Sequence, residues 1–512
     1  MNKHTAPNIL LPIISIIPVI ALTGALVLHE QRVYARPHQV YARSFMATRP
    51  IYQHMSTQQS LWHSIIYNKR APDKGTKLDN HTENRKGSAF RVLNIIGQSI
   101  PMHKTAHYFL PPCIDRVLVA GDNTPPDVQC KRAIRAEWLG LDHDFQGSFT
   151  ITPKEQQYAF SLEYNQDFGT WLDFPLLKDY WISITVPVVA VYHSLNFKEH
   201  VLSNTHRSGD LYQAFNNRDW QFAKLTECSH VIRPTEIRVR IGNALVSHDY
   251  FQFAYNTIFI APMGNKQNAR ELFPAIAGNN QHFAFGAAIF FQFPLNSDTS
   301  EYGICFFANL ESIFNIRNTQ LRTFDLKDKP WSRYLLFNQR CGTANELPGP
   351  QKIPGVNILT REVLIRPYGV FDFSMGLRYI SPLLEAEFGY SIWGKSNEKA
   401  ELKRPWYHPC QYEGIFGIAG EKENTTASNS TIAQRAPDDN NAFVPIDMIF
   451  DINTQSGESG SALNHKVHGS IGLQRDHKNA TIFFVSGAYI DIPQKNGALR
   501  TWGIWISYGA SF

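Results

Sequence analysis

One short stretch of the chain contains a residue type that could act as a nucleophile. Gly457-Glu-Ser-Gly-Ser461 places serines among glycines, the setting of some hydrolase nucleophiles. Acyl transfer also needs a histidine that is oriented by an acid, and the chain has no matching His or Asp motif. We therefore interpret the stretch as a flexible loop between two strands and predict that the protein is not an enzyme.

Metal-ligand types also occur at close spacing. Asp142-His143-Asp144 and His408-Pro409-Cys410 contain them, but neither stretch lies on a scaffold that would point three ligands inward. Solvated loop residues are the favoured interpretation, so we expect no metal and no cofactor. The six cysteines include no CxxC pair, and their even number is compatible with disulfides in an oxidising compartment. They are Cys113, Cys130, Cys228, Cys305, Cys341 and Cys410.

Charged residues at the polar positions of alternating runs are the better candidates for a functional site. In a barrel they would project into the lumen, where rings of charge tune the selectivity of a pore. The alternative is that they form ion pairs which stabilise a closed, filled barrel, and the sequence leaves both readings open. The lumen-facing candidates are Glu163, Arg238, Arg240, Glu311, Arg378, Glu385 and Glu387, of which Arg378 and Glu385 could pair across one hairpin.

The elements that must position these residues have a period of two from about residue 145 onward. In residues 371–379, Phe, Phe, Met, Leu and Tyr alternate with small or polar residues, and residues 384–392 repeat the pattern after a plausible tight turn. This pair is the clearest hairpin in the chain.

Similar runs recur along the chain and predict about 12 to 14 strands, and even numbers are the rule for single-chain barrels. The linkers are rich in Gly, Asn, Asp, Ser and Pro, as in residues 419–441, which we expect to be a solvated loop. Counting strands back from the C-terminus places this loop at the periplasmic end. The other runs are 157–166, 181–193, 236–241, 250–260, 282–293, 303–314, 331–338, 412–418, 443–452, 467–473, 482–492 and 502–512.

The composition of the two strand faces distinguishes a soluble β-sandwich from a membrane barrel. Only 18% of the residues are charged and 13% are aromatic, and the polar face carries many Gly, Ser and Ala. A soluble β-sandwich usually has a solvated face rich in Lys, Glu and Thr. The pattern favours an all-β fold, a transmembrane antiparallel up-and-down β-barrel with an irregular N-terminal region.

The C-terminus carries a resemblance that supports this fold. The chain ends RTWGIWISYGASF, with Ile504, Ile506, Tyr508, Ala510 and Phe512 at alternate positions. This ending resembles the C-terminal signal of bacterial outer-membrane proteins, and Ala510 is smaller than the residue often found there. The resemblance implies recognition by the barrel assembly machinery and a location in the bacterial outer membrane. Runs such as Ala261-Pro-Met-Gly-Asn265 look like segments of uncharacterised porin-like proteins.

The N-terminal part of the chain differs from the rest. An apolar block over residues 9–28 and Val33-Tyr34-Ala35 predict a signal peptide over residues 1–35, with an uncleaved anchor as the alternative. Residues 36–144 show few clean alternations. We expect a periplasmic or plug-like region or a plain extension there, followed by the barrel over residues 145–512.

The sequence restricts the function of the protein less than it restricts the fold. The net charge of +5 comes without a clustered basic tract, so nucleic acid is not an expected partner. The main hypothesis is a porin-like outer-membrane channel or transporter for small solutes, in contact with membrane lipid. The rival hypotheses are a non-conducting structural or adhesive barrel, an outer-membrane enzyme, and a secreted soluble sandwich protein.

Overall fold

The structure is a computed structural model, and it describes most of the chain after residue 41. The described residues are 42–53, 87–111, 114–168, 180–202, 210–248, 251–295, 303–340, 351–367, 369–381, 383–403, 415–418, 451–477, 480–494 and 497–512. The signal peptide expected over residues 1–35 lies outside these ranges.

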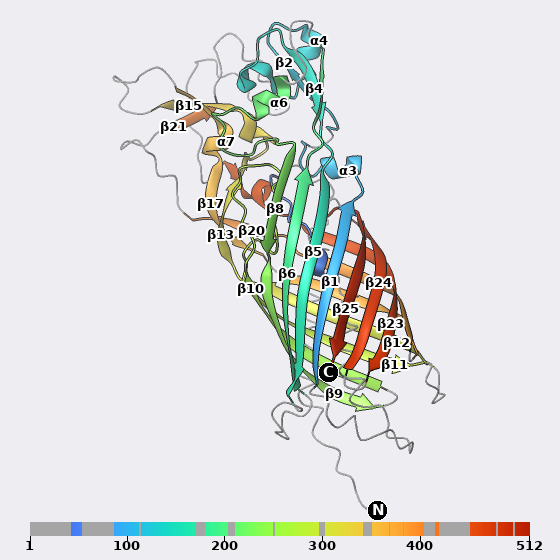
Figure 1. Ribbon diagram of the computed structural model, residues 1–512. Helices are drawn as coiled ribbons and strands as arrows, with labels where there is room; N and C mark the ends of the chain where they lie inside the picture. The colour runs from blue at the N-terminus through green and yellow to red at the C-terminus, as the bar shows by residue number, and fades with distance from the viewer. Residues whose placement is uncertain are drawn as a thin grey trace, which may run out of the picture.

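The chain folds into a closed antiparallel β-barrel of twelve strands (Figure 1). The expected fold class and strand number are therefore confirmed. Each strand pairs with the next along the chain, and the last pairs with the first. The strands are β1 (Ser88–Ser99), β5 (Lys154–Asp167), β6 (Tyr180–Ser194), β9 (Glu236–His248), β10 (Phe251–Pro262), β11 (Ala284–Pro294), β12 (Gly303–Asn315), β18 (Gly369–Ile380), β19 (Leu384–Lys395), β23 (Ala462–His477), β24 (Ala480–Pro493) and β25 (Thr501–Ser511). β8 (Cys228–Pro234) extends β9 along the upper half of β6.

Closure joins the C-terminal strand to β1. Ser88 and Phe512 exchange two backbone hydrogen bonds of 2.8 and 2.9 Å at the end of this seam. The barrel therefore begins at Ser88, and the expected boundary at residue 145 is wrong. Leu93 and Ile95 on β1 point inward and pack in an apolar cluster inside the barrel. Apolar side chains therefore lie on both faces in the middle of β1, which hides the alternation in the sequence.

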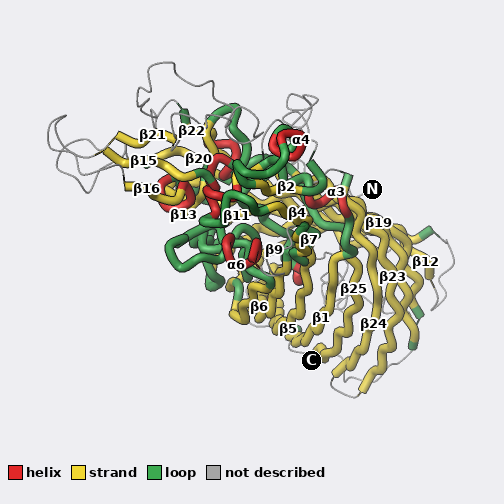
Figure 2. The backbone as a smooth tube through the Cα atoms, turned by 90° about the horizontal axis from the view of Figure 1, so that it is seen from above, coloured by secondary structure: helices red, strands yellow, loops and turns green. Residues whose placement is uncertain are grey.

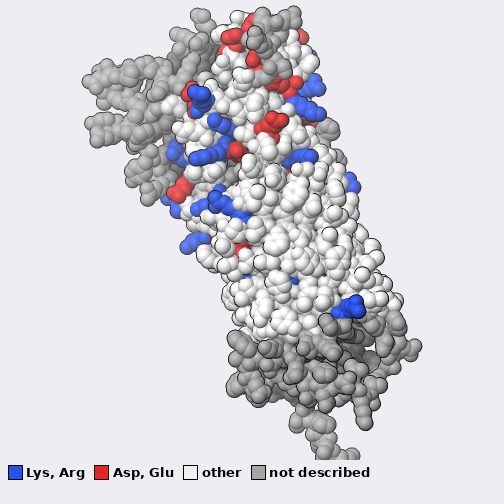
Figure 3. All heavy atoms as spheres, viewed as in Figure 1, with Lys and Arg blue, Asp and Glu red and all other residues white. Residues whose placement is uncertain are grey.

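The barrel wall is apolar outside and polar inside. On β25, for example, Ile504 and Ile506 are exposed, whereas Trp505 and Ser507 between them are buried. The outer surface of the lower barrel shows almost no charged side chains in Figure 3, and the charges gather toward the other end. This arrangement is the inverse of a soluble β-sandwich, whose apolar faces pack together inside.

The two ends of the barrel differ in the length of their connections. At the end that holds Phe512, β9 and β10 are joined through two residues, as are β23 and β24, and β18 and β19 through three. The other two connections at this end, β5 to β6 and β11 to β12, have twelve and eight residues, and every connection longer than these lies at the opposite end. Residues 419–441 fall outside the described residues, but they connect β19 to β23 and so belong to the long-connection end. The periplasmic placement from the sequence is wrong because the count back from the C-terminus includes a strand over residues 443–452 between β19 and β23, and these two strands pair directly in the barrel.

The long connections fold together into a cap (Figures 1 and 2). Its sheets are β3-β2-β4-β7, β13-β17-β20, β16-β15-β21 and β14-β22. The strands are β2 (Val117–Ala120), β3 (Ile134–Arg135), β4 (Gln146–Thr150), β7 (Lys198–Val201), β13 (Asn318–Thr323), β14 (Asp325–Leu326), β15 (Leu336–Arg340), β16 (Gln351–Pro354), β17 (Thr360–Arg366), β20 (Lys399–Leu402), β21 (Ile415–Ile418) and β22 (Ile452–Asn453). The helices at this end are α3 (His103–Ala106), α4 (Pro126–Gln129), η3 (Ala136–Leu139), α6 (Asp210–Phe215), η5 (Ser332–Tyr334), α7 (Gly355–Ile358) and η7 (Thr454–Gly457).

The cap has its own hydrophobic core. Trp331 is fully buried and packs on Phe149, Phe215 and Tyr334, with ring centroids 4.9–6.4 Å apart. These four residues come from three different connections between barrel strands. The cap is thus a folded unit, in contrast to the solvated loops expected from the sequence. No helix among the described residues is long and apolar enough to span a membrane.

Candidate functional site

The lumen is closed on the cap side by a short piece of chain from the N-terminal region. We name residues 42–53 the plug segment; they contain one turn of helix, η1 (Ile51–Gln53). Arg49 on this segment forms an ion pair with Asp372 on β18 and donates a hydrogen bond of 3.3 Å to Asp491 on β24. The two strands lie on different parts of the wall, so one guanidinium ties the plug segment to both.

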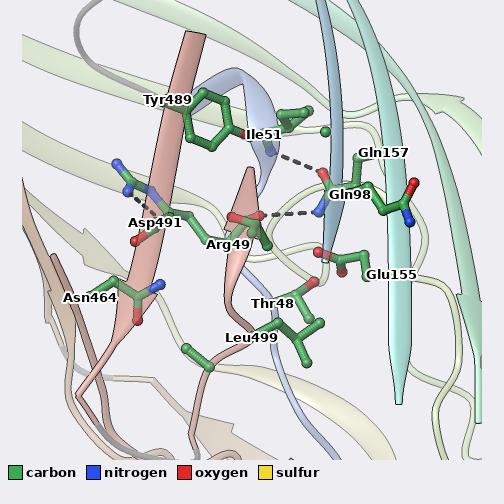
Figure 4. Close-up of a pocket in the computed structure, with 13 residues that line it drawn as sticks. Thr48, Arg49, Ile51, Gln98, Glu155, Gln157, Asn464, Tyr489, Asp491 and Leu499 are labelled. Atoms are coloured by element: carbon green, nitrogen blue, oxygen red, sulfur yellow. Dashed lines mark hydrogen bonds and ion pairs between the residues drawn. The ribbon is translucent and has the colours of Figure 1, made fainter. Parts of the chain in front are cut away.

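Further bonds hold the lower part of the plug segment against β5 and β9, and Figure 4 shows the contact with β5. The Ile51 backbone N–H donates to the Gln157 side chain over 2.9 Å, and the same side chain donates back to the Arg49 carbonyl. The Tyr52 hydroxyl donates to Glu236 over 2.8 Å. On β1, a Cβ at Gly97 would lie 2.5 Å from Ile51 Cδ1, so the absence of a side chain there permits this approach.

The upper part of the plug segment is held by the cap. The Arg43 side chain donates to the Glu458 carbonyl over 2.7 Å, and its backbone N–H donates to the Tyr108 carbonyl over 2.9 Å. The Tyr108 hydroxyl in turn donates to the Phe45 carbonyl, and burial raises the pKa of Tyr108. The segment therefore links the folded cap to the barrel wall.

A lysine and a serine hold the plug segment between these two parts. Lys395 Nζ at the end of β19 donates to the Ala47 carbonyl over 2.8 Å and to Ser459 Oγ over 2.6 Å. Ser459 Oγ also accepts from the Ala47 backbone N–H. Ser459 belongs to the glycine-rich stretch of residues 457–461. In the structure it is fully buried and bonded to Lys395 and to the plug segment.

The seven charged candidates from the sequence all lie on barrel strands. Six are buried inside the barrel, and Glu385 is the most exposed, with 22% of its side chain accessible. They fall into three groups of ion pairs: Glu163 with Arg91; Glu311 with Arg238 and Arg240, joined by Glu236; and Arg378 with Glu385 and Glu387, joined by His468.

The paired side chains lie close together at each of these positions inside the barrel. Arg378 lies 2.9 Å from Glu387 and 3.0 Å from Glu385, and Arg238 lies 2.9 Å from Glu236. The arginines at these positions are only 1–2% exposed, so water does not reach them from either end. Buried charges are tolerated when they are paired and hydrogen-bonded. In this conformation the lumen is closed by side chains as well as by the plug segment.

Two cavities flank the plug segment. The first has an empty volume of about 400 Å³ and lies between the segment and β1, β5 and β24, with Gln98, Glu155, Gln157 and Asp491 on its walls (Figure 4). The second has an empty volume of about 860 Å³ and lies between the segment and β10, β12, β18 and β19. Its wall is mostly apolar and includes Phe45, Ile260, Ile313, Val370 and Trp393.

The cap brings together one group of metal-ligand types. Ligand atoms of Asp122, Glu137 and His143 lie within 4.8 Å of one another. Asp122 is already paired with Arg132 and Arg135, and His143 bonds Glu137 over 2.9 Å. Two cations therefore already neutralise the acidic residue at the centre of the group. Asp142 and Asp144, its neighbours in the sequence, do not belong to it.

Sequence reasoning missed the residues that hold the plug segment. Arg49 lies in a region without alternation, and its partners Asp372 and Asp491 are polar positions of strands that are otherwise read correctly. An inward carboxylate near the end of a strand signals a nearby cation, but the sequence does not tell which cation. Lys395 lies beyond the last alternating residue considered in its hairpin.

Comparison with known proteins assigns this chain to no family. No protein-family model and no curated protein matches this chain. Among solved structures, an outer-membrane channel from Pseudomonas putida F1 is 7% identical with a TM-score of 0.35, covering 83% of this chain and 96% of its own. The transport unit of the autotransporter AIDA-I from Escherichia coli is 6% identical with a TM-score of 0.30, covering 88% and 97%. A FadL homologue of Pseudomonas aeruginosa is 7% identical with a TM-score of 0.26, covering 83% and 89%.

Proposed function

We propose that this protein is a bacterial outer-membrane barrel that passes small solutes when its plug segment is displaced. The observation that carries the proposal is the plug segment itself, which closes the lumen through specific polar contacts of Arg49, Tyr52 and Ala47 with the wall. A closure made of a few hydrogen bonds and ion pairs can open without unfolding the barrel, since every strand keeps its backbone hydrogen bonds to the neighbouring strands.

The wall supports the membrane location. Only a closed barrel satisfies every backbone group of a sheet in hydrocarbon, and here the first and last strands pair along eleven residues. Its outer face is apolar, with aromatic side chains such as Tyr158, Phe285 and Trp502 exposed. Short connections at the Phe512 end and long ones at the cap end match the periplasmic and extracellular ends of outer-membrane barrels. The cap would then face outward.

Delivery to the membrane is part of the same proposal. A signal peptide over residues 1–35 would export the chain, and the barrel assembly machinery would recognise the C-terminal strand. Ile504, Ile506, Tyr508 and Phe512 all project from the outer face of β25 and are 41–47% exposed, so they are available to such a partner before the barrel meets lipid. Ala510 lies in the same series.

The passed solutes would meet a polar path below the plug segment. That path is lined by paired charges of both signs, from Arg238 and Glu311 to Arg378 and Glu387. Such a lining favours small polar or amphipathic solutes over bulk apolar ones, and the charges would tune selectivity. Because the pairs are closed in this conformation, passage also requires them to rearrange.

The test is single-channel conductance of the refolded protein in a planar bilayer. We expect the full-length protein to be mostly silent and a variant lacking residues 42–53 to show discrete openings whose size depends on salt. The exposed Arg366–Glu401 pair in the cap offers a control, Glu401→Gln, which should behave as the wild type. A correctly folded deletion variant that stays silent would contradict the proposal.

A second candidate function is a non-conducting barrel that presents its cap for adhesion. It would rest on the cap core around Trp331, which gathers residues from several connections into one folded unit. Silence of the deletion variant, together with binding of the isolated protein to envelope or cell surfaces, is the result expected for this function.

A further inference from the structure

We infer that the larger cavity beside the plug segment binds a small monocarboxylate with a compact apolar body. The inference deepens the proposed function, on which it rests, by naming the chemical class of the solute. It starts from three features of the cavity: an apolar wall, a buried lysine and an indole N–H without a partner.

The apolar wall indicates that the body of the ligand is apolar. Ile260, Ile313, Val370 and Trp393 come from four barrel strands, and Phe45 comes from the plug segment. An apolar lining with a few polar groups is typical of small-molecule sites, which measure about 300–1,000 Å³. The empty volume of about 860 Å³ includes space open to solvent, so a ligand of one ring and a short polar group fits better than a long chain.

Lys395 indicates that the ligand is negatively charged. Its side chain is buried and lines the cavity, and its Nζ donates only to two uncharged acceptors, the Ala47 carbonyl and Ser459 Oγ. No carboxylate of the described residues lies within ion-pair distance of Nζ. A buried ammonium without a counter-ion is unfavourable, and an anion in the cavity would relieve this cost.

Glu398 is the other charged residue on the cavity wall, and it is already engaged. Its Oε2 accepts from Arg322 over 3.1 Å and from the Ser459 backbone N–H over 3.0 Å. Glu398 also attracts the Lys395 ammonium, but from beyond ion-pair distance, so the atoms in contact with Nζ are the uncharged acceptors.

Trp393 supplies a second donor. Its side chain lines the cavity and is 4% exposed, and its indole N–H has no hydrogen-bond partner among the described residues. A carboxylate has two oxygens, which could accept from the Lys395 ammonium and from this indole. Both donors lie on β19 two residues apart and so on the same inner face of the strand.

Occupancy of the cavity would act on the plug segment. Lys395 Nζ holds the Ala47 carbonyl, and Phe45, Thr48, Pro50 and Gln53 form the opposite wall. A carboxylate is a stronger acceptor for an ammonium than an amide carbonyl. The ligand would therefore compete with Ala47 for Lys395 and weaken the closure, which couples binding to opening.

The first experiment is calorimetric titration of the detergent-solubilised full chain with three probes. Benzoate carries both features of the inferred ligand, benzamide has the same body without the charge, and acetate has the charge without the body. We expect benzoate to bind at least about tenfold more tightly than either control, because a charge-assisted hydrogen bond and the buried ring each contribute. Equal affinity for benzoate and benzamide would overturn the inference.

Variants locate the site. Lys395→Met should weaken benzoate binding by about tenfold or more, while Lys395→Arg should keep most of it. Lys198→Met is the matched control, since Lys198 is exposed on β7 of the cap, and it should leave binding unchanged. Should Lys395→Met fail to fold, Val370→Phe tests the same site by filling the cavity. Wild-type affinity in a folded Lys395→Met or Val370→Phe variant would refute the site.

Conductance separates this inference from the proposed function. Benzoate should raise the opening frequency of the wild type and not that of Lys395→Met. Openings of the plug-deletion variant without benzoate binding to the wild type would leave the channel proposal standing and overturn the site. Benzoate binding that depends on Lys395, with no conductance in any variant, would support the site and refute the channel.

Discussion

Glu311 and Asp372 are direct register partners on β12 and β18, and both side chains point into the barrel. Two neighbouring carboxylates in a poorly solvated lumen repel each other unless each has a cation. Arg238 and Arg240 of the wall pair with Glu311, whereas the cation of Asp372 is Arg49 of the plug segment. Lys466 on β23 also attracts Asp372 from a longer distance, but the direct ion-pair partner of this wall carboxylate comes from the plug segment.

Replacing Arg49 should open the barrel. In Arg49→Gln the plug segment loses its ion pair with Asp372 and its bond to Asp491, while the backbone bonds of Ile51 remain. We expect the open probability in planar bilayers to rise by at least about tenfold, since a shift of ~1.4 kcal/mol is enough for that factor. The control is Arg366→Gln, which removes an exposed arginine of the cap. A variant as silent as the wild type would contradict the assigned role of Arg49.

Replacing Glu311 should destabilise the barrel itself. Glu311→Gln leaves the two buried guanidinium groups of Arg238 and Arg240 with one carboxylate fewer. Removing one partner of a buried ion pair costs about 3–5 kcal/mol, whereas Glu401→Gln on the exposed cap should cost less than about 1 kcal/mol. Denaturant unfolding in detergent, followed by the mobility shift of the folded barrel on gels, measures the difference. Equal midpoints for the two variants would show that the lumen network is not structural.

The sequence predicted the barrel wall better than the contents of the lumen. The hairpin expected over residues 371–379 and 384–392 is present as β18 and β19, and Arg378 pairs with Glu385 within it. Period-two patterns report a strand whose two faces meet different surroundings. β1 was missed because Leu93 and Ile95 face inward against Ile51 and Tyr52, so that apolar side chains lie on both faces of its middle part.

The plug segment and the cap could not be predicted from the sequence, for a different physical reason. Both depend on contacts between residues far apart in the chain, such as Arg49 with Asp491 or Trp331 with the Phe109 carbonyl. No local periodicity encodes such contacts. The cap residues also looked like loop residues, because their strands are short and their hydrophobic positions are scattered over several connections.

Truncating Trp331 should unfold the cap and leave the barrel intact. Its ring is fully buried among aromatic neighbours, and its Nε1 donates to the Phe109 carbonyl over 2.6 Å. Loss of such a ring costs about 3–5 kcal/mol, a large fraction of the roughly 5–15 kcal/mol by which a folded domain is stable. In Trp331→Ala we expect rapid proteolysis of the cap with the barrel fragment still folded, and in Trp331→Phe a smaller effect. Loss of the whole barrel in Trp331→Ala would show that the cap and wall fold as one unit.

His282 should make the junction of cap and barrel sensitive to acid. It precedes β11, outside the strands, with Nδ1 2.7 Å from the Ile316 carbonyl and Nε2 3.0 Å from the Gln320 amide nitrogen. A histidine in this setting donates from Nδ1 and accepts at Nε2, which requires the neutral ring. Burial lowers the pKa of His282 below its ordinary value of 6.5. The bond to the Ile316 carbonyl and Glu398 oppose the shift, and Arg322 and Lys266 reinforce it.

The sign of the pH effect follows from that direction. The unfolded chain takes up a proton on this residue at a higher pH than the folded protein, so the stability that His282 contributes is present above about pH 6.5 and is lost as the pH falls through the lowered folded pKa. The wild type should therefore lose stability between neutral pH and about pH 5 by more than His282→Gln does. His143→Gln, at an exposed position in the cap, is the control and should keep the wild-type profile. Because Nε2 must give up the bond from Gln320 on protonation, proteolysis at this junction should rise over the same pH range in the wild type. Identical pH profiles for the wild type and His282→Gln would assign the acid sensitivity to the lumen carboxylates instead.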